Sequence, residues 1–272
     1  MKGKKVILVT GVSSGIGNAF VKLALNSSEI IIVGMSRNKP ESIESKNFYF
    51  QKTDLNNQES IGKSVKAIIK KFDRIDVLVN NAGIGYRGTI EDMSMTEIRN
   101  QFEVNFFGQI YLTNLILPVM RKQKSGQIIN IGSVASTMST PTMGFYAATK
   151  SAMDKITEVL AQEVAPFNIT VNSIVPGAVK SSFGKNMIEA KNTATSVYIN
   201  LYEEWKKRFR SYFKKHNSSE DVALKILSTI TNPQSESYIA KRDLTMCYLK
   251  RVFPKSFFQW LFLKYYYPYE SS

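Results

Sequence analysis

The feature that most constrains the fold is a regular alternation of short apolar runs with longer helical patterns. The runs KKVILVTG and EIIIVGMS are apolar almost throughout, as strands buried on both faces of a parallel sheet should be. The stretches ESIGKSVKAIIKKF and FYAATKSAMDKITEVLAQEVA instead repeat apolar residues every three or four positions, which is typical of helices. Strands that alternate with such helices predict a parallel sheet covered by helices on both faces.

The alternation continues to about residue 177. Further strands are predicted at NFYFQKTD, IDVLVNNAG, GQIINIGS and ITVNSIVPG, and further helices at residues 16–25 and about 95–121. Beyond this point the pattern is looser, with one or two helices in residues 183–215 and another at SSEDVALKILSTI, capped by Ser218 or Ser219. A chain of 272 residues without a linker predicts one α/β domain.

The predicted fold is a single Rossmann-type, doubly wound parallel sheet with a helical C-terminal lid and tail. We expect residues 1–180 to form the cofactor-binding and catalytic core and residues 181–272 to form the substrate lid and an aromatic tail.

The sequence also gives an expectation about location. Cys247 is the single cysteine, so no internal disulfide can form, which suits a reducing compartment. The N-terminal apolar run is only about five residues, short of the ~7–15 of a signal peptide, and no run approaches the ~18 of a membrane span. We expect a cytoplasmic protein without a signal peptide or transmembrane helix.

A glycine-rich turn joins the first strand to the first helix. Gly11, Gly15 and Gly17 follow the spacing T-G-x-x-x-G-x-G in TGVSSGIG. Glycines in such a turn let the backbone approach a pyrophosphate, and the helix N-terminus offers free N–H groups to the anion. Ser13 and Ser14, just before Gly15 and Ile16, can add hydroxyl donors. The turn predicts a dinucleotide site.

The end of the second strand indicates which dinucleotide binds. Enzymes that use NAD usually place an acid there to bind the ribose 2′-hydroxyl. This chain has Ser36 and Arg37 instead, in GMSRN. An arginine at this place can pair with a 2′-phosphate, so the sequence favours NADP(H) over NAD(H).

More polar groups follow later strands or lie on the helices after them. They are NNAG at residues 80–83, Asn105 in the long helix, Ser133 at the end of the fifth strand, and Tyr146 four residues before Lys150. A lone serine is more often a turn residue, and a lone tyrosine–lysine pair more often serves packing. Ligands bind at the carboxyl edge of an open parallel sheet, so their joint occurrence predicts a site there.

These motifs together resemble the short-chain dehydrogenase/reductase family. The resemblance rests on TGVSSGIG, NNAG, Asn105, Ser133, YAATK and PG, and spans residues 1 to about 184. It implies that Tyr146 is the catalytic acid/base, Lys150 its partner, Ser133 the group that orients the carbonyl, and Asn105 part of a proton relay. A lysine ammonium and an oxidised nicotinamide nearby would lower the pKa of Tyr146 from its usual ~10.

The same resemblance implies the remaining cofactor contacts. Asp54 resembles the residue that meets the adenine amino group, and Ser181 falls where the family places a hydroxyl against the nicotinamide amide. The expected cofactor-binding set is Gly11, Ser13, Ser14, Gly15, Ile16, Gly17, Ser36, Arg37, Asp54, Leu55, Asn81, Ala82, Gly83, Tyr146, Lys150, Pro176, Gly177, Val179 and Ser181.

Aromatic residues dominate two stretches of the last third. Residues 198, 202, 205, 209 and 212 are all aromatic, which places them on one helix face. The family usually builds its substrate lid here, so we expect an apolar substrate. The tail LKRVFPKSFFQWLFLKYYYPYE could cap the pocket, bury a dimer surface or lie in a membrane interface. This last third loosely resembles hydroxysteroid- and retinol-dehydrogenase-like members.

The charge is strongly basic. Residues 1–179 hold 20 Lys/Arg and 14 Asp/Glu, and residues 180–272 hold 16 and 8. A solvated surface is the ordinary explanation; attraction to an anionic cofactor or an acidic membrane are others. Nucleic-acid binding is not expected, because the basic residues form no known reader motif. His216 is the only histidine, so no histidine-based metal cluster can form and no metal is expected.

The sequence therefore predicts an NADP(H)-dependent oxidoreductase that acts on a lipophilic ketone, aldehyde or secondary alcohol such as a steroid, retinoid or ketolipid. A homodimer or tetramer is expected, with peripheral membrane contact through the tail as one option. The alternatives are a 3-oxoacyl thioester reductase of fatty-acid synthesis and a cofactor-sensing binding protein without catalysis.

Overall fold

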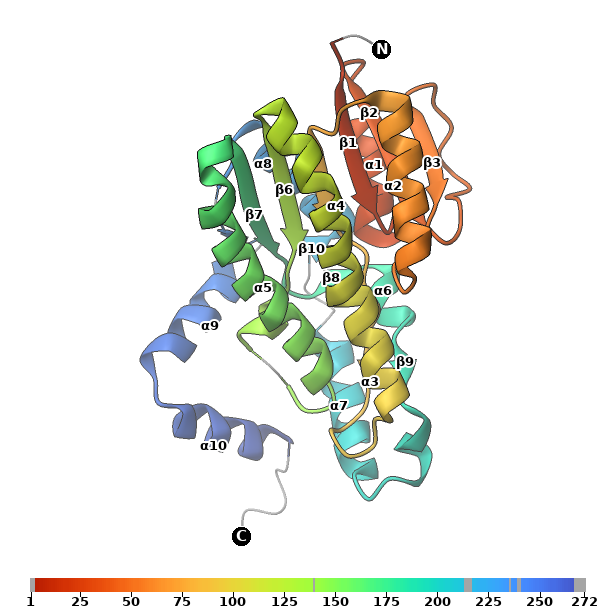
Figure 1. Cartoon of the computed structure of the whole chain (residues 1–272). Coiled ribbons are helices and arrows are strands. Elements are labelled where there is room, and N and C mark those ends of the chain that lie inside the picture. The colour runs from red at the N-terminus through yellow and green to blue at the C-terminus, as the bar shows by residue number, and fades with distance from the viewer. Residues whose placement is uncertain (1–2, 139, 213–216, 235, 239–240, 267–272) are drawn as a thin grey trace.

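A computed structural model describes residues 3–138, 140–212, 217–234, 236–238 and 241–266 (Figure 1). Within these ranges it does not describe the side chains of residues 182, 185, 209–212, 236–238, 241–244, 246, 251, 255, 262, 265 and 266. The predicted aromatic positions 209 and 212, and His216, therefore lie outside the described side chains.

The centre of the molecule is a seven-stranded sheet in the order β11-β7-β6-β4-β1-β2-β3. Neighbouring strands pair in parallel throughout. The strands are β1 (Lys5–Thr10), β2 (Ile30–Ser36), β3 (Phe48–Lys52), β4 (Val77–Asn80), β6 (Gly126–Ile131), β7 (Ile169–Val175) and β11 (Glu236–Tyr238). The predicted parallel sheet is confirmed.

Helices cover both faces of the sheet. On one face lie α2 (Gln58–Phe72), α4 (Gly108–Gln123) and α5 (Gly144–Val164), and on the other α1 (Gly15–Ala24) and α8 (Ser219–Thr231) (Figure 1). Alternate residues of β1 enter separate cores: Leu8 packs with the first group and Ile7 with the second. Because both faces are buried, the strands read as continuous apolar runs.

The strand order reverses beside β1. The chain runs from β1 outward through β2 and β3, then returns to place β4 on the other side of β1. The loops that leave the carboxyl ends of β1 and β4 diverge at such a point and open a crevice for ligands. The glycine-rich turn follows β1 and the NNAG motif begins in β4, so both motifs flank this crevice.

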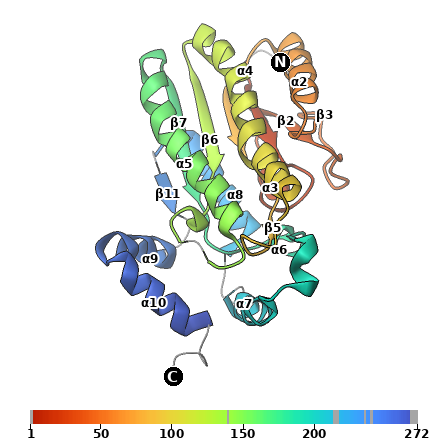
Figure 2. The same cartoon turned by 60° about the horizontal axis from the view of Figure 1, so that its bottom comes forward.

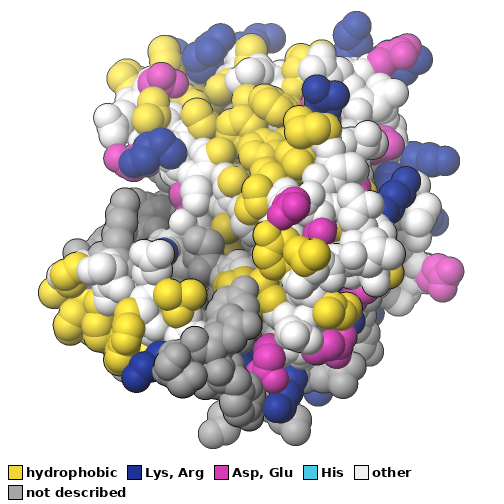
Figure 3. Space-filling model, turned by 90° about the horizontal axis from the view of Figure 1, so that it is seen from below, with side chains coloured by type: hydrophobic (Ala, Val, Ile, Leu, Met, Phe, Trp, Pro, Cys, Tyr) yellow, Lys and Arg dark blue, Asp and Glu magenta, His cyan; other side chains and the backbone are white. Residues whose placement is uncertain are grey.

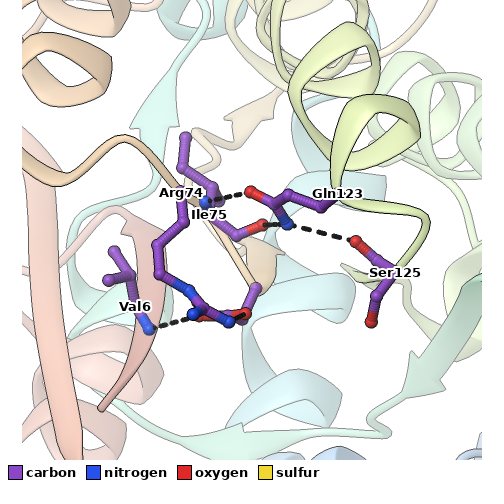
Figure 4. Close-up of polar contacts among 6 residues, drawn as sticks. Val6, Arg74, Ile75, Gln123 and Ser125 are labelled. Atoms are coloured by element: carbon purple, nitrogen blue, oxygen red, sulfur yellow. Dashed lines mark hydrogen bonds and ion pairs between the residues drawn. The ribbon is translucent and has the colours of Figure 1, made fainter. Parts of the chain in front are cut away.

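The opposite, amino-terminal edge of the sheet is closed by hydrogen bonds (Figure 4). The Asp76 carboxylate accepts from the Val6 amide (2.7 Å) and from the Arg74 guanidinium (2.5 and 3.0 Å). The Gln123 amide accepts from the Ile75 N–H (2.9 Å) and donates to the Ile75 and Ser125 carbonyls (3.0 and 3.1 Å). These contacts tie β1, β4 and the end of α4 together away from the crevice.

The long helix predicted at about residues 95–121 is interrupted. It consists of α3 (Met95–Phe102), a π-helical turn (Glu103–Phe107) and α4, and Asn105 is the centre of the π turn. π turns are rare and frequent at functional sites. Gly108 follows directly, and a Cβ there would overlap the Leu55 carbonyl oxygen. The distortion and this glycine bring the helix close to the loop after β3.

The last third adds short elements around the crevice. Two-residue strands pair β5 (Tyr86–Arg87) with β9 (Ile188–Glu189) and β8 (Val179–Lys180) with β10 (Asn217–Ser218). The helices are α6 (Ser182–Lys185), α7 (Ile199–Tyr212), α9 (Lys241–Val252) and α10 (Lys255–Tyr266). Ser218, one of the two predicted caps, closes a capping box with Asp221 at the start of α8.

The tail forms two helices beside the main body. Figure 2 shows α9 and α10 together below the sheet, and α10 contacts α7. Among the described residues, no helix is long and apolar enough to cross a membrane.

Candidate active site

A cavity of about 840 Å³ lies at the carboxyl edge of the sheet. All but two of the predicted site residues line it. The lining predicted residues are Gly11, Ser13, Ser14, Gly15, Ile16, Ser36, Arg37, Asp54, Leu55, Asn81, Ala82, Gly83, Ser133, Tyr146, Lys150, Pro176, Gly177, Val179 and Ser181. The exceptions are Gly17 and Asn105, which are buried but do not line the cavity.

The glycine-rich turn is bonded to the loop after β4. The Thr10 hydroxyl oxygen accepts from the amides of Asn81 and Ala82 (3.0 Å each), and the Asn81 side chain donates to the Thr10 carbonyl (2.8 Å). Two loops from adjacent strands thus form one rigid floor. A rigid floor can present backbone N–H groups to a bound anion without reorganising.

Steric demands explain the glycines of this turn. Gly11 and Gly15 have φ of +73° and +59°, the left-handed region that other residues adopt only with strain. A Cβ on Gly11 would also lie 2.8 Å from the Ala82 Cα. Gly17 does not line the cavity; a Cβ there would overlap the Gly11 carbonyl oxygen. Its role is therefore to let the start of α1 pack against the turn.

Polar groups from β2 and the loop after β3 line one end of the cavity. Arg37 lines this end and is exposed. The Ser36 hydroxyl donates to the Asn38 carbonyl (2.7 Å), and the Asp54 carboxylate accepts from the Asn56 amide (3.0 Å). A carboxylate can accept from the amino group of a base, and a guanidinium can bind a phosphate.

Ser133, Tyr146 and Lys150 meet in the middle of the cavity lining. Ser133 precedes the 3₁₀ turn Val134–Ser136, and its side chain is close enough to Tyr146 to influence the pKa of the phenol. Tyr146 and Lys150 share one face of α5, and the Lys150 Nζ lies 5.9 Å from the tyrosine ring centre. The predicted convergence of these three side chains is what the structure shows.

Burial shifts both titrating groups toward their neutral forms. Burial raises the pKa of Tyr146 to about 12, with Asp154 adding to it and the contact with Ser133 opposing it. Burial lowers the pKa of Lys150 to about 8, although Asp154 favours the charged ammonium. The expectation of a lowered tyrosine pKa is therefore wrong for the protein alone, because desolvation and Asp154 outweigh the contact with Ser133. Tyr146 is protonated at neutral pH.

Asn105 does not face the cavity. Its side-chain oxygen accepts from the Ile84 amide (2.8 Å), and its NH₂ group donates to the Ile84 carbonyl (2.9 Å) and to Thr149 (3.3 Å). Asn105 therefore joins the π turn to the loop after β4 and to α5, one residue before Lys150. This geometry shows a positioning contact, and the relay role remains untested.

The loop after β7 closes the far end of the cavity. Pro176 accepts a hydrogen bond from the Val134 amide (3.0 Å), which connects it to the loop that carries Ser133. The Ser181 hydroxyl oxygen accepts from the Phe183 amide (3.3 Å). Both contacts fix this loop relative to the reaction centre.

An apolar lobe adjoins Tyr146, and most of its residues were not predicted. The Phe183 ring lies 5.5 Å from the Tyr146 ring, centre to centre. Trp205, from the predicted aromatic face of α7, is buried with Met143 and Leu201. The remaining apolar side chains come from Met138, Met187, Phe258 and Leu261. Irregular loops and the tail supply most of them, and their sequence carries no periodic signal.

Helix α7 is held by a buried carboxylate. Asp92 accepts from the hydroxyls of Thr89 (2.6 Å), Ser196 (2.6 Å) and Tyr202 (2.7 Å). Burial raises the pKa of Asp92, but these three hydrogen bonds outweigh it and leave the pKa lowered. This lid clasp, made by residues 89, 92, 196 and 202, fixes the start of α7 over the loop after β5.

The lining suits a nicotinamide dinucleotide. At one end it offers a guanidinium and a carboxylate, at the glycine-rich turn backbone amides, and at the other end the reaction centre and Ser181. The guanidinium suits a phosphate, the backbone amides suit a pyrophosphate, and the Ser181 hydroxyl suits an amide. Fold and site together define a dinucleotide-binding oxidoreductase of the Rossmann class.

Comparisons with known proteins agree. A family model for short chain dehydrogenases matches residues 5–192. A 3-ketodihydrosphingosine reductase of Bacteroides thetaiotaomicron is 38% identical over 182 residues, which is 67% of this chain and 66% of that protein. A probable short-chain type dehydrogenase/reductase, VdlC, of Helicobacter pylori is 30% identical over 259 residues, 94% of this chain and 95% of that one.

A solved structure of ElxO with NADP bound has a TM-score of 0.74 at 25% identity, covering 89% of this chain and 99% of that one. This chain belongs to the short chain dehydrogenase family. It is accordingly an oxidoreductase that acts on CH–OH groups with a nicotinamide cofactor.

Proposed function

We propose that the protein is an NADP(H)-dependent oxidoreductase that interconverts a lipophilic ketone or aldehyde and its alcohol. The observation that carries the proposal is the meeting of Ser133, Tyr146 and Lys150 beside an apolar lobe in one cavity. Polar groups for chemistry and apolar walls for binding are the usual composition of a small-molecule site.

Tyr146 is the proton donor to the carbonyl oxygen in the reducing direction. Its raised pKa keeps the phenol protonated at neutral pH, and it faces the cavity. The nicotinamide, when bound, supplies the hydride to the carbonyl carbon. A positioned general acid contributes about 10²–10⁴-fold in rate.

Ser133 and Lys150 support the tyrosine. Ser133 and Tyr146 line the same cavity, and in this proposal one substrate carbonyl oxygen accepts from both hydroxyls. Lys150, still largely an ammonium at pH 7 with its pKa of about 8, provides the positive charge that favours the phenolate left after proton transfer. Asp54, Asn81 and the glycine-rich turn hold the cofactor.

The preference for NADP(H) is proposed from Arg37. Its guanidinium lines the cavity after β2, where an NAD enzyme would carry an acid. The neighbour ElxO, solved with NADP bound, is consistent with this preference. A planar guanidinium can bind a 2′-phosphate through two charge-assisted hydrogen bonds.

The substrate is proposed to be a long-chain ketolipid or a molecule of similar polarity. The name of the Bacteroides relative describes reduction of a ketone on a sphingoid base. The apolar lobe here includes Met138, Met143, Phe183, Trp205 and Phe258. In this proposal residues 181–272 act as the lid and tail of a core formed by residues 1–180.

Self-association and a cytoplasmic location complete the proposal. Phe107 on the π turn and Ile156 and Val159 on α5 are exposed apolar side chains. Figure 3 shows a broad hydrophobic area in the upper half of the face that it draws. Such a patch normally marks an interface, which supports a homodimer or tetramer.

The test is a screen of NADPH oxidation with purified protein. The substrates are a 3-keto sphingoid base, a steroid ketone, retinal, a 3-oxoacyl thioester and small polar aldehydes, each also offered with NADH. The proposal expects the highest kcat/KM with a lipophilic ketone and NADPH. A clear preference for the 3-oxoacyl thioester would favour the fatty-acid reductase alternative. Cofactor binding without turnover of any class would favour a cofactor-sensing protein.

A further inference from the structure

We propose that the outer face of α9 and α10 binds an anionic lipid surface, so that the protein takes its substrate from a membrane. The substrate half of this inference rests on the proposed function; the binding half does not. We call the exposed apolar residues of these helices the tail face: Tyr248, Leu249, Val252, Phe253, Phe257, Trp260, Leu261 and Leu263.

Helix α10 is apolar on both sides. Phe258 is 4% exposed and lines the cavity, so one side of α10 is a wall of the candidate active site. Trp260 and Leu263, on other sides of the same helix, are 52% and 53% exposed. Exposed apolar side chains gathered on one side of a helix normally mark an interaction surface.

A line of aromatic rings connects the two sides. Phe257 contacts Phe258 (5.5 Å between ring centres), Trp260 (6.2 Å) and Phe253 (5.0 Å). Leu261 both lines the cavity and is 41% exposed. These side chains therefore connect the apolar wall of the cavity directly to the tail face.

The charge of the tail helices indicates what kind of surface covers the tail face. Residues 241–266 include six Lys/Arg and a single acid, Asp243. The Lys264 ammonium lies 4.6 Å from the Trp260 ring centre, so cation and aromatic are presented together. Lysine beside tryptophan suits the headgroup region of a bilayer, and each cation adds attraction to anionic lipid.

The geometry fits a helix pair that lies on a membrane. No helix among the described residues could span one. Figure 3 shows hydrophobic side chains at the lower left, over α9 and α10, with Lys/Arg beside them. An apolar helix face buried about 5–10 Å deep in a lipid interface needs no greater length.

The tail is also attached to the reaction centre. Cys247 is buried, and the Lys250 ammonium donates to the Thr137 carbonyl, in the loop between Ser133 and Tyr146. The next residue, Met138, lines the cavity. A membrane bound to the tail face would therefore lie beside the apolar lobe, on the side where α10 forms its wall.

The experiment is flotation of full-length protein with phosphatidylcholine vesicles, with and without phosphatidylglycerol. Leu263→Glu is compared with Leu224→Glu on α8; the two leucines are 53% and 55% exposed, so the pair matches in size, charge change and exposure. Wild type and Leu224→Glu should float with the anionic vesicles and lose binding as salt is raised. Leu263→Glu should lower the bound fraction about tenfold.

A second matched pair of variants, together with thermal melts, controls for misfolding. Val252→Glu on α9 and Val197→Glu before α7 change residues that are 77% and 86% exposed, and thermal melts of all four variants should resemble wild type. Only Val252→Glu should weaken flotation. The proposal is overturned if wild type does not float, if both members of a pair lose binding equally, or if the tail variants leave flotation unchanged and convert an oligomer to monomer in sedimentation.

Flotation needs neither substrate nor cofactor, so its result stands apart from the reductase screen. If both hold, Leu263→Glu should reduce kcat/KM for a ketone embedded in anionic vesicles and leave that for a water-soluble carbonyl unchanged. If flotation succeeds and the screen finds no ketone reduction, the proposed function is contradicted, but the binding of the tail face to anionic lipid still holds.

Discussion

The Lys150 ammonium donates a hydrogen bond of 2.7 Å to the carbonyl oxygen of Ile131, the last residue of β6. Both residues are buried, so this bond fixes α5 against the carboxyl edge of the sheet. It brings Tyr146, one turn earlier, to the height of Ser133. The same burial is what lowers the pKa of Lys150 to about 8.

The buried lysine should make stability depend on pH. Its folded pKa of about 8 lies below the ordinary lysine value of ~10.4, so between these values the unfolded chain holds a proton that the native state lacks. The free energy of unfolding should therefore rise with pH across this window, by up to about 3 kcal/mol from this group.

Urea unfolding at pH 7.5 and pH 10 measures this effect. The stability difference between wild type and Lys150→Met should grow in favour of wild type as pH rises, because only wild type sheds the cost of a buried ammonium. Lys155→Met, on the exposed side of the same helix, is the control and should show no such trend. A constant difference for Lys150→Met would mean that the ammonium is solvated.

Two helix glycines should respond oppositely to alanine. A Cβ on Gly17 would overlap the Gly11 carbonyl oxygen, so Gly17→Ala should displace the glycine-rich turn and weaken NADPH binding at least about tenfold. Gly62, in α2, has open space, its nearest neighbour being the Tyr111 hydroxyl at 3.8 Å. Gly62→Ala should stabilise the protein by about 0.5–1 kcal/mol and leave binding unchanged.

Fluorescence titration with NADPH and thermal melts check both glycine variants. Normal NADPH affinity in Gly17→Ala would show that the turn does not hold the cofactor in the way the site requires.

Cofactor choice should follow the charge at residue 37. Arg37→Asp removes the proposed 2′-phosphate partner and provides a carboxylate for a ribose 2′-hydroxyl, so the ratio of kcat/KM for NADPH to that for NADH should fall about 100-fold. Lys39→Asp makes a similar charge change two residues away and does not line the cavity. If the two variants shift the ratio equally, the preference arises from overall charge and not from contact.

The lid clasp offers a test of substrate binding alone. Asp92→Asn keeps the size of the side chain but replaces the charged oxygen that accepts from the Ser196 and Tyr202 hydroxyls by a neutral amide oxygen, which is a weaker acceptor. KM for a lipophilic ketone should rise several-fold with little change in NADPH affinity. Asp73→Asn, at the exposed C-cap of α2, is the matched control. An equal loss of NADPH binding would show that Asp92 supports the whole fold.

The sequence allowed the sheet and the meeting of Ser133, Tyr146 and Lys150 at one cavity to be predicted, because both have local signatures. Continuous apolar runs such as the one in β1 indicate burial on two faces, and Tyr146 and Lys150 are one helical turn apart. Strands β5 and β9 were missed since two residues carry no periodicity. Phe258 reaches the cavity from more than 100 residues beyond Tyr146, which no local pattern encodes. Asp154 could have been found, because it follows Lys150 at the same four-residue spacing.

The raised pKa of Tyr146 could not be predicted from the sequence. Its direction depends on how far the ring is removed from water, and part of that burial comes from Phe183 and the cluster around Trp205. A neighbouring lysine alone predicts the opposite shift.

Ser133 should matter less than the tyrosine beside it. Ser133→Ala removes one hydrogen bond to the carbonyl oxygen without removing the proton donor, so kcat should fall about 10–100-fold. Ser136→Ala, whose hydroxyl donates to the Ser133 carbonyl (2.8 Å), is the control and should change kcat little. Activity of Ser133→Ala equal to that of wild type would mean that Ser133 does not touch the substrate.

The most direct measurement is the comparison of Tyr146→Phe with wild type, in both turnover and NADPH binding. The substitution removes only the phenolic hydroxyl, and Tyr111→Phe on α4, outside the cavity lining, controls for the loss of a hydroxyl elsewhere. The account predicts that kcat falls at least about 10³-fold, by loss of the general acid, while NADPH affinity stays within about threefold. Turnover by Tyr146→Phe within tenfold of wild type would contradict the assignment of Tyr146 as the proton donor.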